Sequence, residues 1–361
     1  MGPQKYLYID SLRGLAILLV LLVHNGQSSC FPHQLNLLIR DGQYGVQLFF
    51  LVSAFTLMLS YENRKEEKSA TLKFYTRRFF RIAPMYYIAL IYFFFQNYIG
   101  FNYFYTGEIK NSIPWDAVLS NALFIHGIKP TWINSAVPGG WSIAVEMTFY
   151  LLLPFICKVI TNINRSFIFL LGCLLLSSLF LIVLKNTSLD TMYFLNMYFP
   201  NQLPIFALGI FAYYLSKGNF GQISKNSMFF LIFTCFVYIF LPFPRHFQYS
   251  LCFFVLLMTL SSNKSKFIVN PFFVYIGKIS FSIYFVHFAV LYWLSEIGFE
   301  NFIPIVDFKT AILNKIMQYL TLLSFSVFIS HFTHKYIEIY FKKIGRNVIR
   351  KFDNQFSNFS K

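Results

Sequence analysis

Three ionisable side chains lie inside apolar runs of the sequence, where a lipid environment would penalise them. They are His24, Glu146 and His287. An ionisable group at membrane depth is a candidate functional group. Two histidines with a carboxylate could move protons during a reaction, because the pKa of histidine lies close to neutrality. A single buried histidine could instead be a hydrogen-bonded contact between helices.

The three groups are expected at one depth. At about 1.5 Å per residue, His24 lies about 16 Å beyond Arg13, which is at the inner end of the first run. Glu146 lies about 8 Å into a helix that enters from the outer side at Trp141, and His287 about 22 Å into a helix from the inner side. A bilayer core of about 30 Å then places them together in its outer half. Arg13 could itself anchor its helix at the inner surface.

A second group of candidates is the basic cluster in KFYTRRFFRIAP, residues 73–84. Arg77, Arg78 and Arg81 could bind the phosphates of a cytoplasmic ligand, because guanidinium groups match phosphate geometry. Positive charge at the inner face is also an ordinary topology signal, and both interpretations stay open at this point. Pro84 is expected in the first turn of a span that begins near residue 82.

The elements that must position these residues are membrane helices. The chain is 57% hydrophobic and 12% charged, whereas soluble domains are about a quarter charged. Runs of about 20 apolar residues indicate transmembrane helices. The candidate runs are residues 10–27, 44–61, 82–99, 141–160, 166–184, 196–216, 227–243, 247–263, 272–294 and 311–334. The predicted fold is an all-α polytopic membrane bundle of about ten helices.

Basic residues predict the orientation, because Lys and Arg in short loops favour the cytoplasm. With both termini cytoplasmic, few of the 30 basic residues remain outside, namely Arg40, Lys110, Lys129, Lys185, Arg245, Lys309 and Lys315. Residues 1–340 then form the membrane domain and residues 341–361 a basic cytoplasmic tail. The net charge of +16 reflects topology and attraction to anionic lipids rather than binding of nucleic acid. No spacing typical of a zinc site or a phosphate loop is present, so we expect neither a metal nor a permanently bound cofactor.

The same residues resemble the acyltransferase family 3 membrane proteins, which O-acylate carbohydrates and other extracytoplasmic acceptors. The resemblance extends over nearly the whole chain, and its motifs occur in the expected order. They are Arg13 and His24 separated by ten residues, GVQLFFLVSAF (45–55), RRFFRIAP (77–84), Trp141, Ser142, Ile143, Glu146, Phe149 and Tyr150, then Gly277, Ser280, Tyr284 and His287, and finally Ile337 with Glu338. Gln47 and Ala54 depart from the family's usual acidic residue and glycine, and the usual proline after the Ile-Glu pair is missing.

The resemblance implies an acyl-CoA-dependent O-acyltransferase, with acetyl-CoA as the usual cytoplasmic donor and a carbohydrate hydroxyl on the outer side as acceptor. It implies that His24 is the general base, that Glu146 orients a histidine or contacts the acceptor, and that His287 is a second base or a hydrogen-bond donor to the thioester. The residues expected to bind the donor are Arg13, Arg77, Arg78 and Arg81, and those expected to bind substrate are Trp141, Ser142, Tyr150, Ser280 and Tyr284. Direct transfer and a covalent acyl-histidine both remain open.

We therefore expect a multi-pass bacterial inner membrane protein that acetylates a surface polysaccharide, such as the O-antigen of lipopolysaccharide, either free or lipid-linked. The outer loop of residues 102–140, with Trp115, His126 and Trp132, is expected to recognise the acceptor, because loops on a rigid scaffold often bind ligands. The alternative is a proton-coupled transporter or flippase of a lipid-linked or small-molecule cargo. Against it, the sequence lacks the inverted repeat and the paired broken helices in corresponding halves that are typical of that class. A non-catalytic relative is a third interpretation, and the Gln47 departure is its only support.

Overall fold

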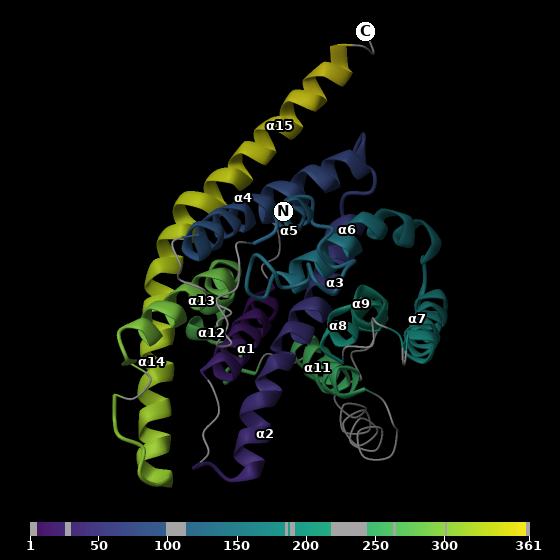
Figure 1. The fold of residues 1–361 in the computed structure, drawn as a ribbon. Helices are drawn as coiled ribbons and strands as arrows, with labels where there is room; N and C mark the ends of the chain where they lie inside the picture. Colours follow the sequence, from purple (N-terminus) through teal and green to yellow (C-terminus); the bar gives the residue numbers. More distant parts are fainter. Residues whose placement is uncertain are drawn as a thin grey trace. The chain divides into compact units, whose positions relative to one another are not determined.

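The computed structural model describes residues 6–25, 30–98, 113–184, 187, 192–217, 244–262, 265–299 and 302–358 (Figure 1). Every regular element in these ranges is a helix, and no strand occurs within them. The all-α prediction is confirmed for this part of the chain. The chain divides into two compact units. Unit 1 comprises the residues up to Thr56 together with Ile205–His331, and unit 2 comprises Leu57–Pro204 together with Phe332–Lys361.

Unit 1 is organised around its first helix, α1. Its elements are α1 (Leu7–His24), α2 (His33–Asp41), a 3-10 turn (Gly42–Tyr44), the first part of α3 (Gly45–Glu62), most of α9 (Phe199–Lys217), α11 (Arg245–Ser262), α12 (Pro271–Lys278), α13 (Ser280–Glu296) and α14 (Phe308–Thr333) up to His331. Helix α1 contacts α2, the 3-10 turn, α11, α12 and α13. Its contact with α12 is the most extensive, and Figure 1 shows the two helices side by side.

Two glycines explain how closely α1 and α12 approach each other. A Cβ atom added to Gly277 would lie 1.7 Å from the carbonyl oxygen of Asp10, and one added to Gly14 would lie 2.2 Å from that of Phe273. Both obstacles are backbone atoms, which cannot move aside as a flexible side chain can. Glycine therefore allows the two helix backbones to touch, as small residues do in membrane helix pairs.

Unit 2 is organised around α4. Its elements are the end of α3, α4 (Ala70–Tyr98), α5 (Trp115–Ala122), α6 (Trp141–Val159), α7 (Ile163–Leu184), α8 (Met192–Met197), the beginning of α9, the end of α14, a π-helical turn (His334–Glu338) and α15 (Ile339–Asn358). Helix α4 contacts α5, α6, the π-helical turn and α15. Helix α7 has an outer apolar face, on which Leu175 and Ile182 are 63% and 71% exposed. Such a face is suited to contact with lipid.

Within the residues that the structure describes, six helical segments are long and apolar enough to cross a membrane, and a bent helix pair raises the number to seven. The six are Leu7–His24, His33–Glu62, Ala70–Asn97, Trp141–Val159, Ile163–Leu184 and Phe308–Asn354. This supports a multi-pass membrane protein, while ten spans and cytoplasmic termini stay predictions. The predicted runs 196–216 and 247–263 correspond to α9 and α11, and the predicted run 227–243 lies outside the described residues.

The beginning of α4 differs from the prediction. The helix begins at Ala70 rather than near residue 82, so Arg77, Arg78 and Arg81 lie within it. Pro84 lies in its interior and not in its first turn. Hydropathy obscures this beginning because charged residues interrupt the apolar run, although arginine is itself a good helix former.

The predicted straight span of residues 272–294 is also wrong. It consists of α12 and α13, which are bent by 76° with Ile279 between them. Helix α12 begins with a proline, Pro271, after Asn270, whose side chain accepts the backbone N–H of Phe273, as is usual at a helix start. His287 therefore lies about 10 Å into α13 and not about 22 Å along one continuous helix.

Candidate active site

The structure brings His24 and His287 together in unit 1. His24 is the last residue of α1, and His287 lies in the middle of α13. The Nδ1 atom of His24 is 3.3 Å from Nε2 of His287, and the ring centroids are 5.2 Å apart. His287 is completely buried, whereas His24 is partly exposed. His24 is therefore the histidine that a substrate could reach, and His287 lies behind it.

Carbonyl contacts determine which ring nitrogens carry protons. His24 Nδ1 lies 2.8 Å from the carbonyl oxygen of Val20, and His287 Nδ1 lies 2.9 Å from that of Ile283. Because a carbonyl can only accept, each Nδ1 carries a hydrogen and donates it. The unprotonated Nε2 of His287 then accepts from the Nδ1–H of His24. In the neutral ring the lone pair of His24 lies on Nε2, which is the basic atom of the pair.

Aromatic rings surround the two histidines. The ring of Phe288 lies 4.7 Å from that of His24 and 4.0 Å from that of His287, measured between centroids. Tyr284, a predicted substrate residue, is buried one turn before His287 with its ring 6.0 Å away. Ser280, another predicted substrate residue, is buried at the first position of α13, beside the bend. These rings restrict the access of water to the buried side of the pair.

Two residues of α14 hold the end of α1, and the sequence analysis missed both. The ammonium group of Lys315 donates to the carbonyl of Asn25 at 2.9 Å, and the side-chain amide of Asn25 donates to the carbonyl of Lys315 at 3.0 Å. The hydroxyl of Tyr319 donates to the carbonyl of Leu18 at 3.1 Å. These bonds fix the last turns of α1, which carry His24. The available signal was a lysine and a tyrosine four residues apart within an apolar run.

A polar and aromatic group next to this end of α1 was also missed. The hydroxyl of Tyr249 donates to the carboxylate of Asp41, and the ring of Tyr249 stacks on that of Tyr44 at 4.4 Å. Gly42 packs directly on α1, since a Cβ there would lie 3.4 Å from the backbone nitrogen of Val23. The group therefore lies close to the turn that ends in His24. Carboxylates and tyrosines are suited to bind hydroxyl groups.

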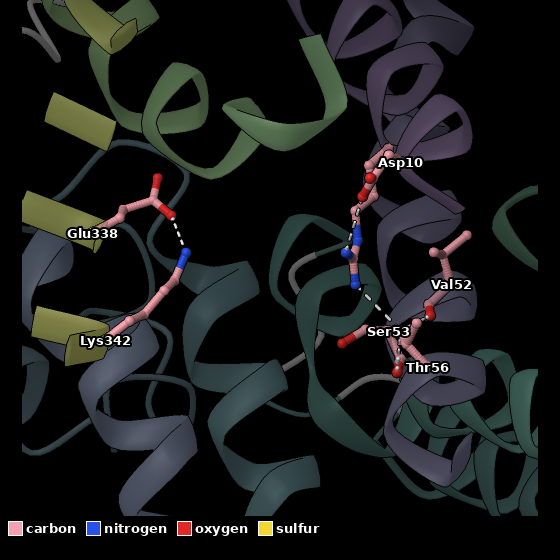
Figure 2. Close-up of polar contacts among 7 residues, drawn as sticks. Asp10, Val52, Ser53, Thr56, Glu338 and Lys342 are labelled. Carbon is pink, nitrogen blue, oxygen red and sulfur yellow. Dashed lines mark hydrogen bonds and ion pairs between the residues drawn. The ribbon is translucent and has the colours of Figure 1, made fainter. Parts of the chain in front are cut away.

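Arg13 lies elsewhere in unit 1, about 16 Å along α1 from His24. One nitrogen of its guanidinium group donates to the hydroxyl of Thr56 at 3.2 Å, and another lies 3.9 Å from the carboxylate of Asp10. Figure 2 shows Asp10 and Thr56 with Val52 and Ser53, whose carbonyls accept the Thr56 hydroxyl. These contacts orient Arg13 from two sides and hold its charge in place.

Glu146 belongs to unit 2, where it forms a cluster with two arginines of α4. Its carboxylate accepts the hydroxyl of Tyr150, one turn further along α6. The guanidinium group of Arg78 lies 5.9 Å from the centre of the Tyr150 ring. Arg78 is also near enough to Arg81 and Glu146 to interact electrostatically with both. The cluster thus combines two cations, a carboxylate and a phenol.

This cluster corrects the predicted depths. The sequence analysis placed Arg78 and Arg81 at the inner face and Glu146 in the outer half, whereas the structure places them together. The error follows from the beginning of α4, which is 12 residues earlier than expected. Arg77 lies on another face of α4 and forms an ion pair with Glu67. Because Glu146 and the histidines belong to different units, their predicted convergence stays a prediction.

Trp141 and Ser142 begin α6 and are both buried. The Ser142 hydroxyl donates to the carbonyl of Gly139 at 3.0 Å, so it stabilises the start of the helix. In the preceding loop, of which residues 113–140 are described, Trp115 is 76% exposed. Trp132 is held by a hydrogen bond from its indole to Asp116 at 2.9 Å. The two tryptophans lie in the loop predicted to contact an acceptor.

His126, the third residue predicted from this loop, is completely buried. Its Nε2–H donates to the carbonyl of Gly140 at 2.9 Å, and the hydroxyl of Tyr86 lies 3.3 Å from the same nitrogen. The Tyr86 hydroxyl donates to Asn121 at 2.7 Å. Burial lowers the pKa of His126 below its usual value. His126 therefore ties the loop to α4 and α6 and does not face an acceptor.

Neither unit offers a metal site among the residues that the structure describes. No three His, Cys, Asp or Glu side chains there are close enough together to bind a metal ion. Unit 1 supplies a histidine base with a fixed tautomer and an oriented arginine. Unit 2 supplies two neighbouring arginines beside a carboxylate. A base and separate cationic groups are what transfer from an anionic donor to a hydroxyl needs.

Comparison with known proteins points to the same chemistry. A family model described as an acyltransferase domain matches residues 6–335. A protein of Acidianus two-tailed virus whose name proposes an acetyltransferase (ORF330) is 27% identical over 305 residues, which cover 80% of this chain and 84% of that protein. The peptidoglycan O-acetyltransferase OatA of Listeria monocytogenes is 28% identical over 163 residues, 42% of this chain and 24% of that protein.

A third relative is the acyltransferase MdmB of Streptomyces mycarofaciens. It is 27% identical over 173 residues, which cover 45% of this chain and 42% of that protein. No solved structure matches the chain.

Proposed function

The chain belongs to the acyltransferase domain family whose model its residues 6–335 match, and we propose that it is a membrane O-acyltransferase. In this proposal it moves an acetyl group from acetyl-CoA, bound from the cytoplasm, to a hydroxyl of an extracytoplasmic carbohydrate. The acceptor is a bacterial surface polysaccharide, of which the O-antigen of lipopolysaccharide is our first choice. The chain then acts in the inner membrane.

The observation that carries the proposal is the tautomer of the histidine pair. Val20 and His287 both receive the Nδ1–H of His24, so the ring presents Nε2 as a base in a fixed direction. His24 is partly exposed and His287 is not. A neutral imidazole with one nitrogen fixed by hydrogen bonds, on a residue that is partly exposed, is suited to general base catalysis.

The reaction then needs one base and no covalent intermediate. His24 Nε2 takes the proton of the acceptor hydroxyl while the hydroxyl oxygen forms a bond to the thioester carbonyl carbon. The carbon–sulfur bond of the resulting tetrahedral intermediate breaks, and the CoA sulfur receives the proton from His24. The products are an O-acetyl ester and CoA with a free thiol, and the neutral imidazole is regenerated. During the step, His287 and Val20 hold the Nδ1–H of the imidazolium.

Cationic groups support the donor half of the proposal. In unit 1, Arg13, which Thr56 orients, is suited to bind a phosphate of CoA. In unit 2, the pair of Arg78 and Arg81 is separately suited to the same role. Arg77 is less suited, because Glu67 already neutralises it. Glu146 holds Tyr150 beside Arg78, so we assign it to the orientation of this cluster.

For the acceptor half, support comes from the polar group beside the end of α1. Asp41 and Tyr249 lie next to the turn that carries His24, and their oxygens could accept hydrogen bonds from the hydroxyls of a sugar. The relative from Listeria is named as a peptidoglycan O-acetyltransferase, which is a carbohydrate modification outside the cytoplasm. Trp115, the exposed first residue of α5, is a second candidate for acceptor contact.

The test compares O-acetylation of surface polysaccharide in cells that carry the wild type, His24→Ala, His331→Ala or no copy. His331 is the matched control, since it is a histidine in α14 whose ring contacts the hydroxyl of Tyr275 at 3.1 Å. Membrane levels of the protein are matched by immunoblot, and acetyl groups are measured by proton NMR on the purified polysaccharide. We expect acetyl signals with the wild type and His331→Ala, and none in the other two strains.

Equal acetylation in all four strains would overturn the polysaccharide assignment. Purified protein with acetyl-CoA then decides whether another acceptor is used, since an acyltransferase releases CoA thiol when its acceptor is added. Absence of any CoA release, together with His24-dependent movement of a cargo across vesicles, would favour the transporter alternative.

A further inference from the structure

Helix α15 presents two different faces. The face toward α4 carries the buried residues Gly345 and Ile349. Gly345 touches the ring of Phe80, since a Cβ there would lie 2.8 Å from the Phe80 Cβ atom. Asp353 of α15 forms an ion pair with Lys73, which is buried in α4. The inner face of α15 is therefore already occupied within unit 2, and α15 lies along α4 (Figure 1).

The adjoining face of α15 is basic and exposed. Lys343, Arg346 and Arg350 are all exposed, and their spacing of three and four residues aligns them in one stripe. Lys351 is exposed next to the stripe. We call Lys343, Arg346 and Arg350 the basic stripe. Asp353 lies one turn beyond Arg350, at the end of the stripe, and forms the ion pair with Lys73.

The same exposed side is aromatic and aliphatic immediately before the stripe. Tyr336, Ile339 and Tyr340 are 63%, 48% and 56% exposed, and they lie one to two turns before Lys343. An exposed apolar patch beside polar residues often marks a surface that contacts a protein or a membrane. Tyrosines are typical of the boundary between the lipid core and the headgroups. The exposed surface thus changes from apolar to basic along a single helix.

The helical run that includes α15 is too long to lie within a single bilayer core. The run Phe308–Asn354 has 47 residues, or about 70 Å at 1.5 Å per residue. A bilayer core is only about 30 Å thick. More than half of the run therefore lies outside the core. Tyrosines at the edge of the core, as Tyr336 and Tyr340 would be, then leave the basic stripe of the same unit at headgroup level.

We propose that the basic stripe of α15 binds the headgroups of anionic phospholipids. The guanidinium groups of Arg346 and Arg350 and the ammonium group of Lys343 pair with lipid phosphates. Tyr336, Ile339 and Tyr340 contact the upper part of the acyl chains. A soluble phosphate compound would use the cations but would leave these three apolar residues in water. The site therefore selects a lipid over a free phosphate.

Binding at this stripe has a consequence for α4. Helix α15 is attached to α4 at Phe80 and Lys73, close to Arg78 and Arg81 in the sequence. A lipid held on the outer face of α15 anchors both helices at the membrane surface. The proposal concerns lipid binding alone and does not depend on the acyltransferase reaction, so it can be tested without an acceptor.

The experiment uses the full chain, purified in a neutral detergent and titrated with short-chain phosphatidylglycerol. Native mass spectrometry and microscale thermophoresis measure the bound lipid. The test variant is Lys343→Gln, Arg346→Gln, Arg350→Gln. A matched control removes equal charge from exposed residues of the loop before α4, as Arg64→Gln, Lys65→Gln, Lys68→Gln. That loop also contains Glu62, Glu66 and Glu67, so it has no continuous basic face.

We expect the test variant to lower the affinity for phosphatidylglycerol by about 10- to 100-fold, since each basic residue at a lipid surface contributes several-fold. The loop control is expected to change it by less than about threefold. A variant that keeps charge, Lys343→Arg, Arg346→Lys, Arg350→Lys, is expected to retain binding, and its retention separates lost charge from misfolding. Phosphatidylcholine and inorganic phosphate are expected to bind weakly to every form.

Three outcomes would overturn the proposal. They are unchanged affinity in the test variant, equal loss in the loop control, and binding of inorganic phosphate or CoA at the stripe that competes with phosphatidylglycerol. The last outcome would make the stripe a site for soluble phosphates.

Discussion

Replacing His287 with leucine tests the hydrogen bond that we assign behind His24. Leucine fills much of the same space but removes the Nε2 acceptor that lies 3.3 Å from His24 Nδ1. When His24 takes a proton it becomes a cation, and hydrogen bonds to charged groups contribute about 1.5–3 kcal/mol. The bond is long, and Val20 still accepts the same N–H at 2.8 Å. We therefore expect the lower end of this range, which is a fall in kcat/KM of about tenfold.

The assay measures initial rates of transfer from radiolabelled acetyl-CoA to de-O-acetylated polysaccharide, with the protein in nanodiscs. The loss is expected in kcat, with KM for acetyl-CoA unchanged, because His287 does not contact the donor in this mechanism. Glutamine is the matched variant, since its amide oxygen can accept from His24, and we expect it to stay within about threefold of the wild type.

Because His287 is completely buried, thermal unfolding of each variant is measured alongside its activity. Full activity of the leucine variant would refute the assigned role. Equal losses in the leucine and glutamine variants, both with normal stability, would show that His287 acts in some way other than accepting this hydrogen bond.

Three further predictions address other parts of the molecule. Arg13→Gln is expected to raise KM for acetyl-CoA by about tenfold or more, because a charge-assisted bond to phosphate is lost. Arg77 is already paired with Glu67, so Arg77→Gln is expected to change KM by less than about threefold. Equal effects of the two variants in steady-state kinetics would contradict the assignment. Gly277→Ala places a Cβ 1.7 Å from a backbone oxygen and is expected to lower the free energy of unfolding by about 3 kcal/mol or more. The control Gly172→Ala, whose Cβ would have nothing within 4 Å, is expected to be neutral or stabilising by up to about 1 kcal/mol. Melting temperatures in detergent compare the two variants, and similar temperatures would refute the close contact. Because the pKa of His126 is lowered in the folded protein, the unfolded chain binds more protons just below pH 6.5. Stability therefore falls as the pH drops through this value and levels off below the folded pKa. His126→Gln should make the melting temperature less sensitive to pH between about pH 7.5 and 5.5, and an unchanged pH dependence would show that His126 is not its origin.

The residue types in the sequence identified several candidate site residues, but they did not predict how these residues are arranged in space. An arginine and a histidine in the first apolar run, and a histidine in a later one, identified Arg13, His24 and His287. The sequence analysis also expected the two histidines to meet, by counting residues along straight helices. They do meet, but on a bent pair of helices, so the arithmetic of that expectation was wrong for His287.

Residues with ordinary local patterns were missed. Lys315 and Tyr319 look like members of a membrane helix with two polar side chains, and only packing shows that they hold Asn25 and Leu18. Tyr249 is one aromatic residue among many in the sequence, and its bond to Asp41 joins positions 208 residues apart. Neither hydropathy nor helical periodicity carries information on such partners.

The sequence by itself determined the all-helical class and most of the helix positions, because both follow from apolar runs and helix propensity, which are local properties. Tertiary structure alone decided the bend between α12 and α13, the neighbours of Arg78, and the tautomer of His24. Each of these depends on atoms far apart in the chain, such as His24 and His287, which are 263 residues apart. Backbone contacts at Gly14 and Gly277 set how α1 meets α12, and a local pattern cannot encode that distance.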